Sequence, residues 1–227
     1  MDFSSGNSGC VLRDAVVKIG PECQQEGAYC KELGSEVAPE IFAIIPNGYV
    51  MERLQQKTRL PSLLLDIESL LETYVWSRPS MDYHVTNRDY RDYHEQLGVP
   101  IPPWAVPQEF CMTHGDPTVS NTVYRGDKLI MCDPRPPRFY VPQCRESDMG
   151  RILQSYFQWE TAAYNIPEVN YQLPFFWDHP VLRVKAAFWC EATTARIAYL
   201  EKSKPAPRER IFDWCKRVRK ECQIIYG

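Results

Sequence analysis

The first 54 residues alternate between short apolar runs and turn-forming residues, which is a pattern typical of strands. A Val-rich run over residues 10–20 ends at a glycine and predicts strand structure. Helix-forming residues between Pro21 and Gly34 predict one helix, and residues 41–54 predict two strands joined by the turn sequence Pro-Asn-Gly. We therefore expect a small sheet with one helix at the N-terminus.

From residue 55 onward the apolar positions recur mainly at helical spacing, beginning with a leucine-rich stretch that ends near residue 76. Further helices are predicted over residues 88–98, 147–164, 180–201 and 206–224. Two short strands flank the turn at Gly126 and Asp127. The pattern as a whole predicts an α+β fold with two lobes. The small β-rich lobe comprises residues 1–54, and the larger, mainly helical lobe comprises residues 55–227.

Composition narrows the class of protein. Apolar residues make up 44% of the 227 residues and charged residues 24%, which is typical of a soluble globular protein. The net charge is −3 and no basic block is visible, so a nucleic acid is not the favoured partner. No apolar run approaches the ~20 residues that span a membrane. The polar start MDFSSGNSGC does not resemble a signal peptide, and we expect a cytoplasmic protein.

The sequence contains nine cysteines but no Cys-x-x-Cys pair. Structural zinc sites usually need such close pairs, and a disulfide framework is typical of a short secreted chain. We therefore expect reduced and mostly buried thiols.

The stretch THGDPTVSNTVYRGDKLIMCDP, residues 113–134, contains the candidate chemistry. Asp116 is predicted to lie in a turn, Asn121 at the start of the first hairpin strand, and Asp133 after the second. Because the hairpin folds back on itself, Asn121 and Asp133 can come together as oxygen ligands for Mg²⁺. Asp116 is then free to orient a hydroxyl or accept its proton. Asp and Asn also cap turns without any catalytic role, and that interpretation stays open for each residue alone.

In order and spacing, this stretch resembles the catalytic loop of the aminoglycoside phosphotransferase and choline kinase group. These are small-molecule kinases with a protein-kinase-like fold. Their loop reads His-Gly-Asp, four variable residues, then Asn, which corresponds here to His114, Gly115, Asp116 and Asn121. The resemblance implies that Asp133 is the metal-binding aspartate and that Asp148, at the start of the next helix, braces the loop.

The N-terminal part resembles the same group independently. Lys18 corresponds to the ATP-binding lysine, and its partner is Glu26, with Glu22 as the alternative. The adenine-binding hinge corresponds to Glu52, Arg53 and Leu54. A shortened phosphate-covering loop corresponds to Ser4, Ser5, Gly6, Asn7, Ser8 and Gly9, whose backbone N–H groups could approach phosphate oxygens. The resemblance covers about residues 4–160, although residues 56–110 match only in helical character.

The resemblance implies an ATP-dependent phosphotransferase that moves the γ-phosphate to a hydroxyl group of a small molecule. Catalysis of this kind depends on positioning and on neutralisation of charge. Asp116 and His114 would form the catalytic group, with Asn121 and Asp133 as ligands of Mg²⁺. The acceptor stays open between a sugar, an amino alcohol, an antibiotic and a nucleoside. ATP rather than GTP as donor and the oligomeric state also stay open.

Two alternatives compete with this interpretation. A protein kinase is disfavoured because only residues 134–147 separate Asp133 from Asp148, and prolines stiffen that segment. A catalytically inactive pseudokinase could use its aromatic-rich segments as a binding module, since Tyr, Trp and Phe are favoured at interfaces. Aromatic side chains that pack a helical lobe or line an acceptor pocket are the simpler explanation. We expect an active enzyme.

Overall fold

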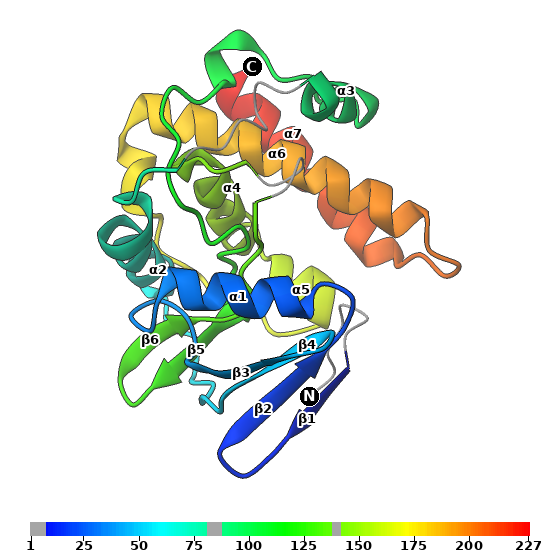
Figure 1. The fold of residues 1–227 in the computed structure, drawn as a ribbon. Coiled ribbons are helices and arrows are strands. Elements are labelled where there is room, and N and C mark those ends of the chain that lie inside the picture. The colour runs from blue at the N-terminus through cyan, green and yellow to red at the C-terminus, as the bar shows by residue number, and fades with distance from the viewer. Residues whose placement is uncertain (1–7, 81–87, 138–141) are drawn as a thin grey trace. The chain divides into compact units, whose positions relative to one another are not determined.

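The computed structural model has an α+β fold, with most strands in the N-terminal part and most helices in the C-terminal part (Figure 1). The parts of the chain that it describes are residues 8–80, 88–137 and 142–227. The chain is divided into two compact units. Unit 1 consists of residues 1–58 and 121–136, and unit 2 consists of residues 59–120 and 137–227.

Unit 1 contains a four-stranded antiparallel sheet in the order β1-β2-β4-β3. Its strands are β1 (Ser8–Val11), β2 (Ala15–Ile19), β3 (Ile41–Ile45) and β4 (Gly48–Glu52). In the turn between β3 and β4, Asn47 has a φ of 57°, a left-handed conformation that Asn tolerates better than most residues. The Pro-Asn-Gly sequence thus marks the hairpin turn that the pattern predicts.

Helix α1 (Cys23–Leu33) approaches the sheet closely at Gly27. A Cβ atom on Gly27 would lie only 2.7 Å from the Cβ atom of Tyr49 in β4. A larger residue would push α1 away from the sheet, because real Cβ atoms do not approach so closely. Glycine at this position therefore allows the neighbouring Glu26 to reach side chains that project from the sheet.

A two-stranded sheet, β5 (Thr122–Arg125) and β6 (Lys128–Met131), completes unit 1. Backbone hydrogen bonds attach it to the N-terminal part of the chain. The N–H group of Met131 donates to the carbonyl oxygen of Val37 at 2.7 Å, and Tyr124 pairs with Gln55 in an isolated bridge. The hairpin is therefore fixed against residues that precede it by more than 60 positions.

Unit 2 is built from helices, of which α6 packs against both α4 and α7 (Figure 1). The helices are α2 (Leu63–Leu71), α3 (Arg88–Gln96), α4 (Arg145–Tyr156), α5 (Trp159–Tyr164), α6 (Pro180–Lys202) and α7 (Glu209–Tyr226). A π-helical turn, Glu72–Trp76, extends α2. Gly150 lets α4 approach α6, since a Cβ atom there would lie 2.6 Å from the backbone nitrogen of Cys190.

The continuous helix expected over residues 147–164 is interrupted. Helix α4 ends at Tyr156, and Gln158 adopts a left-handed conformation with a φ of 67° before α5 begins. The side chain of Gln158 bonds to both backbone groups of Val169, which stabilises the break. Because this contact is not local, the helical periodicity of the sequence does not reveal it.

Within the described ranges, no helix is long and apolar enough to cross a membrane. All nine cysteines lie in these ranges as free thiols. All except Cys10 and Cys132 are buried.

His94 on α3 is a buried histidine in an aromatic core. Its ring lies 4.5 Å from that of Tyr90 and 6.0 Å from that of Trp189, measured between centroids. Neither ring nitrogen of His94 has a hydrogen-bond partner among the described residues. Burial, assisted by the nearby positive charge of Arg196, lowers the pKa of His94 to about 4. Protonation of His94 therefore opposes folding.

We expect His94→Phe to remove part of the acid sensitivity of the fold while keeping its aromatic packing. An unfolded histidine has a pKa of about 6.5, so the unfolded state binds the proton first as the pH falls. Between pH 7 and pH 4, the free energy of unfolding of the wild type should fall by about 3 kcal/mol more than that of the variant. Urea unfolding at both pH values measures this difference. An identical pH dependence in the two proteins would contradict the assignment.

Candidate active site

In unit 1, Lys18 lies at the centre of a buried polar cluster, which we call the Lys18 cluster (Lys18, Glu26, Tyr49 and Asp133). The Nζ atom of Lys18 donates to Oε1 of Glu26 at 2.6 Å and to Oδ1 of Asp133 at 2.9 Å. The hydroxyl of Tyr49 donates to the same oxygen of Glu26 at 2.6 Å. Lys18 is only 2% exposed. The carboxylate that contacts Lys18 is thus that of Glu26, the residue that the sequence favours over Glu22.

Four elements of the fold position this cluster. Lys18 in β2 and Tyr49 in β4 are partners in the sheet register, and Glu26 comes from α1. Asp133 follows β6 and has a φ of 56°, a left-handed conformation that is uncommon outside glycine. Burial alone would lower the pKa of Lys18, but the carboxylates of Asp133 and Glu26 outweigh burial and raise it. Lys18 is therefore a fixed positive charge at neutral pH.

The hairpin brings the second predicted metal ligand close to the first along the backbone. Asn121 ends a 3₁₀ turn, Val119–Asn121, and its carbonyl oxygen accepts a hydrogen bond from the N–H group of Cys132 at 2.8 Å. Cys132 directly precedes Asp133, whose side chain is 36% exposed. Amide and carboxylate oxygens are the hard ligands that Mg²⁺ prefers, so the donor set fits this ion. The described residues contain no group of three His, Cys, Asp or Glu side chains that could hold a metal by themselves.

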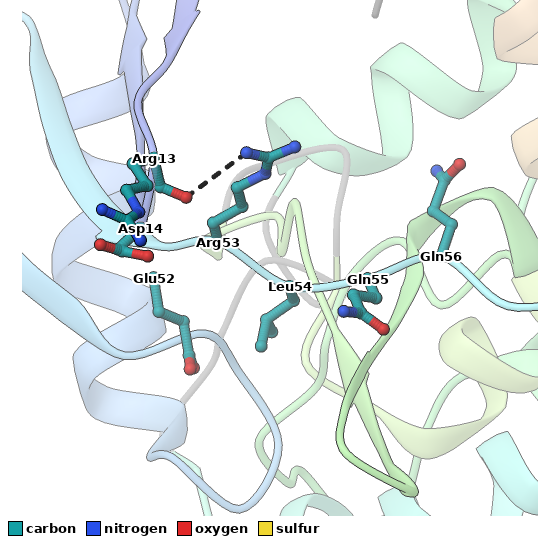
Figure 2. A pocket seen from close by; sticks show the side chains of 7 residues that line it. All are labelled: Arg13, Asp14, Glu52, Arg53, Leu54, Gln55 and Gln56. Carbon is teal, nitrogen blue, oxygen red and sulfur yellow. Dashed lines mark hydrogen bonds between the residues drawn. The ribbon is translucent and has the colours of Figure 1, made fainter.

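The predicted hinge residues line a pocket of about 650 Å³ within unit 1 (Figure 2). Its lining residues are Arg13, Asp14, Glu52, Arg53, Leu54, Gln55 and Gln56. The carboxylate of Glu52 accepts hydrogen bonds from the guanidinium of Arg125 and from the N–H group of Glu40. Burial would raise the pKa of Glu52, but these donors lower it below its usual value. The side chain of Glu52 thus fixes the hinge to β5, and the pocket volume is typical of a site for a small ligand.

The predicted phosphate-covering loop is described only in part. Ser4, Ser5, Gly6 and Asn7 lie outside the described residues. Ser8 and Gly9 begin β1, where Gly9 is the register partner of Lys18. The start of this strand is therefore next to the lysine in the sheet.

In unit 2, Asp148 braces the first half of the predicted catalytic loop, as the resemblance implies. Its carboxylate is fully buried and accepts hydrogen bonds from the backbone N–H groups of His114 and Gly115, both at 2.8 Å. The indole Nε1 of Trp76 donates to it at 3.0 Å. Burial raises the pKa of Asp148 to about 6, against the effect of these donors, which favour the ionised form.

A second brace holds the other half of the loop and was not predicted from the sequence. The N–H group of Val119 donates to the hydroxyl of Ser155 at 3.0 Å, and that of Ser120 donates to Oε1 of Glu160 at 3.2 Å. The hydroxyl of Ser155 in turn donates to Glu160 at 2.8 Å. The only hint of this brace in the sequence is that Ser155 and Glu160 are polar residues at positions where the helical pattern predicts burial.

Between the two braces lies Asp116, which is 8% exposed. Its N–H group donates to Nδ1 of His114 at 3.3 Å. His114 is fully buried, and this hydrogen bond ties its ring to the backbone of the loop. One carboxylate oxygen of Asp116 accepts a hydrogen bond from the guanidinium of Arg151 on α4. Sequence reasoning assigned no role to Arg151.

Three solved structures that are similar to this chain carry descriptions of small-molecule kinases. A protein described as a fructosamine-3-kinase from Haemophilus somnus 129PT aligns with a TM-score of 0.53 and 12% identity, over 94% of this chain and 84% of that one. A protein with the same description from Thermobifida fusca YX-ER1 aligns with a TM-score of 0.51 and 13% identity, over 95% of this chain and 93% of that one. A choline kinase from Streptococcus pneumoniae aligns with a TM-score of 0.52 and 13% identity, over 99% of this chain and 92% of that one. No protein-family model matches the sequence, and no curated protein matches it significantly.

These alignments extend over nearly the whole chain, so the chain has the fold shared by the choline kinase-like proteins. The α+β, kinase-like fold predicted from the sequence is thereby confirmed. At 12–13% identity, the comparison establishes the fold alone.

The Lys18 cluster yields a prediction about stability. We expect Lys18→Met to lower the free energy of unfolding by about 3 kcal/mol, because Glu26 is then left buried without its counter-charge. Adding Glu26→Gln should restore much of the loss, since the double variant contains no unpaired charge at that position. Urea unfolding measures both effects. Lys57→Met, which breaks an exposed pair with Asp127, is the matched control and should change stability little. Additive losses from the two cluster substitutions would contradict the coupling.

The brace at Asp148 yields a second prediction. In Asp148→Asn, the amide group replaces one acceptor with a donor, so buried N–H groups of the loop lose their partner. We expect a loss of about 2 kcal/mol in unfolding free energy, and faster hydrogen exchange at the amide of Gly115. The exposed Asp66→Asn in α2 serves as the control. Unchanged exchange at Gly115 would show that Asp148 does not hold the loop.

Proposed function

We propose that this protein is an ATP-dependent phosphotransferase that moves the γ-phosphoryl group to a hydroxyl of a small molecule. The observation that carries the proposal is the Lys18 cluster. It joins a fixed cation, its carboxylate partner and the predicted metal-binding aspartate within one unit. Phosphoryl transfer needs this combination of positioning and charge neutralisation.

On the donor side, Lys18 would bind phosphate oxygens, and Glu26 with Tyr49 would keep the ammonium group in place. Asn121 and Asp133 would hold Mg²⁺, which when bound supplies positive charge to the phosphates. The partial exposure of Asp133 supports this role, because a ligand can reach its carboxylate. The pocket lined by Glu52, Arg53 and Leu54 would receive the base of the nucleotide.

On the acceptor side, Asp116 would orient the hydroxyl and accept its proton as the phosphoryl group transfers. The two braces support this role, because they fix the backbone on either side of Asp116. The ring of His114 is fully buried and accepts a hydrogen bond from the N–H group of Asp116. His114 would therefore act by shaping the loop.

The acceptor is proposed to be a small molecule rather than a protein. The short, proline-rich segment between Asp133 and Asp148 offers little chain on which a peptide could dock. The structural relatives include proteins described as acting on fructosamine and on choline, so a sugar derivative or an amino alcohol is the first class to test. Both carry the required hydroxyl group.

The experiment separates binding from chemistry. MgATP should raise the melting temperature of the wild type, since a ligand that binds only the native state stabilises it. ATP consumption is then measured against a panel of sugars, amino sugars and amino alcohols. Millimolar MgATP that neither shifts the melting temperature nor is consumed with any acceptor would overturn the proposal. Binding without consumption would favour the pseudokinase alternative.

With an acceptor in hand, two matched variants test the roles. Asp116→Asn should lower kcat by about two to four orders of magnitude, the usual contribution of a positioned acid–base group, while MgATP affinity stays nearly unchanged. Asp133→Asn should weaken MgATP binding as well as turnover. Wild-type turnover in Asp116→Asn would contradict the role of Asp116.

A further inference from the structure

Three residues on one face of α4 contact the predicted catalytic loop at successive points. Asp148, Arg151 and Ser155 are spaced at i, i+3 and i+7, which places them on the same side of a helix. Asp148 holds His114 and Gly115, and Ser155 holds Val119. Arg151 lies between them and contacts the side chain of Asp116, which is the proposed proton acceptor.

The guanidinium of Arg151 is itself held in place. Its Nη1 atom donates to Oε1 of Gln154 at 2.5 Å, and Nε2 of Gln154 donates to the hydroxyl of Thr194 on α6 at 3.0 Å. Gln154 and Thr194 are fully buried. The close approach of α4 and α6 at Gly150 puts these two side chains within reach of each other. Arg151 therefore presents a fixed donor to Asp116.

The pair is also largely removed from solvent. The side chains of Arg151 and Asp116 are 16% and 11% exposed. An opposite charge at this depth favours the ionised form of a carboxylate more than it would at the surface. Within unit 2, the guanidinium of Arg151 and the ring of His114 both contact Asp116, and Arg151 also acts on the charge of Asp148.

We infer that Arg151 is a positioning residue for the reaction: it holds one carboxylate oxygen of Asp116 so that the other is directed to the acceptor hydroxyl. This role rests on the proposed function. Arg151 holds Asp116 in one orientation, and it acts through Asp116 rather than on the nucleotide. Two other roles compete with it. Arg151 could be a purely structural ion pair, or it could bind the acceptor directly.

A measurement that needs no turnover tests the pairing. The titration midpoint of Asp116 is followed by ¹³C NMR of side-chain carboxyl carbons, with Asp116→Asn identifying its signal. Removing the guanidinium in Arg151→Gln should raise the midpoint by about one pH unit, because an opposite charge lowers the pKa of a carboxyl group. Arg151→Lys retains the charge and should return the midpoint toward the wild-type value.

The matched control is Lys185→Gln. Lys185 forms a comparably buried ion pair with Glu146, also on α4. Its loss perturbs the same helix without touching Asp116, so the midpoint of Asp116 should stay at the wild-type value. If Arg151→Gln leaves the midpoint unchanged, or if Lys185→Gln moves it equally, the inference is overturned.

A kinetic arm, run with an acceptor from the panel, tests the role in the reaction. Arg151→Gln should lower kcat/KM by about 10- to 100-fold, the scale of a misplaced catalytic group, and leave MgATP affinity unchanged. The acidic limb of its pH profile should move upward with the midpoint of Asp116. In an Asp116→Asn background the same substitution should cost less than about threefold, because its partner is already gone.

The outcomes separate the two proposals. An equal loss in both backgrounds would show that Arg151 acts independently of Asp116, as direct binding of the acceptor requires, and would overturn the inference. Full activity of Arg151→Gln would leave only a structural ion pair and would overturn it as well. A wild type that neither binds nor consumes MgATP would overturn the proposed function, and the positioning role of Arg151 with it. In an active enzyme, by contrast, an unmoved midpoint would count against Arg151 alone.

Discussion

A buried ammonium group is stable only where carboxylates balance its charge, and unit 1 is organised around one such group. Lys18 is 2% exposed and obtains its counter-charges from a helix and from a hairpin that lie far apart in the sequence. Its sheet partner Tyr49 binds the same carboxylate, and Gly27 allows α1 to come close enough to supply it. The sheet, the helix and the hairpin are therefore linked by one electrostatic requirement.

Unit 2 satisfies a different requirement. The loop from His114 to Ser120 is a buried segment whose backbone N–H groups lack the partners that a regular strand or helix would provide. Side chains of α4 and α5 supply these partners, which explains why the helices bury carboxylates and a hydroxyl. Each of these polar groups is costly to bury alone, and each is compensated by a hydrogen bond to the loop. The chemistry proposed for Asp116 depends on this rigid backbone.

The sequence predicted the features that are encoded locally. The two hairpins follow from turn residues, and the helices follow from apolar spacing. The Lys18–Glu26 pair and the brace at Asp148 were implied by the order of residues in a family, and their geometry agrees with it. The features that the sequence did not reveal depend on tertiary contacts. Tyr49, Ser155 and Glu160 look like ordinary strand or helix residues, and Arg151 looks like a helix-surface cation. The break at Gln158 is stabilised by Val169, which no local pattern contains.

The bond between Glu52 and Arg125 has a consequence for any elongated ligand of unit 1. Arg125 belongs to the hairpin that carries Asp133, and Glu52 belongs to the hinge that lines the pocket. Hinge and hairpin are thus clamped together at one end, while Lys18 clamps the same hairpin to β2 at the other. The spacing between the pocket and the proposed metal ligands is consequently a property of unit 1 by itself. Two ion pairs thus set the length of ligand that could reach from the pocket to both proposed metal ligands, without any contribution from the unit that carries Asp116.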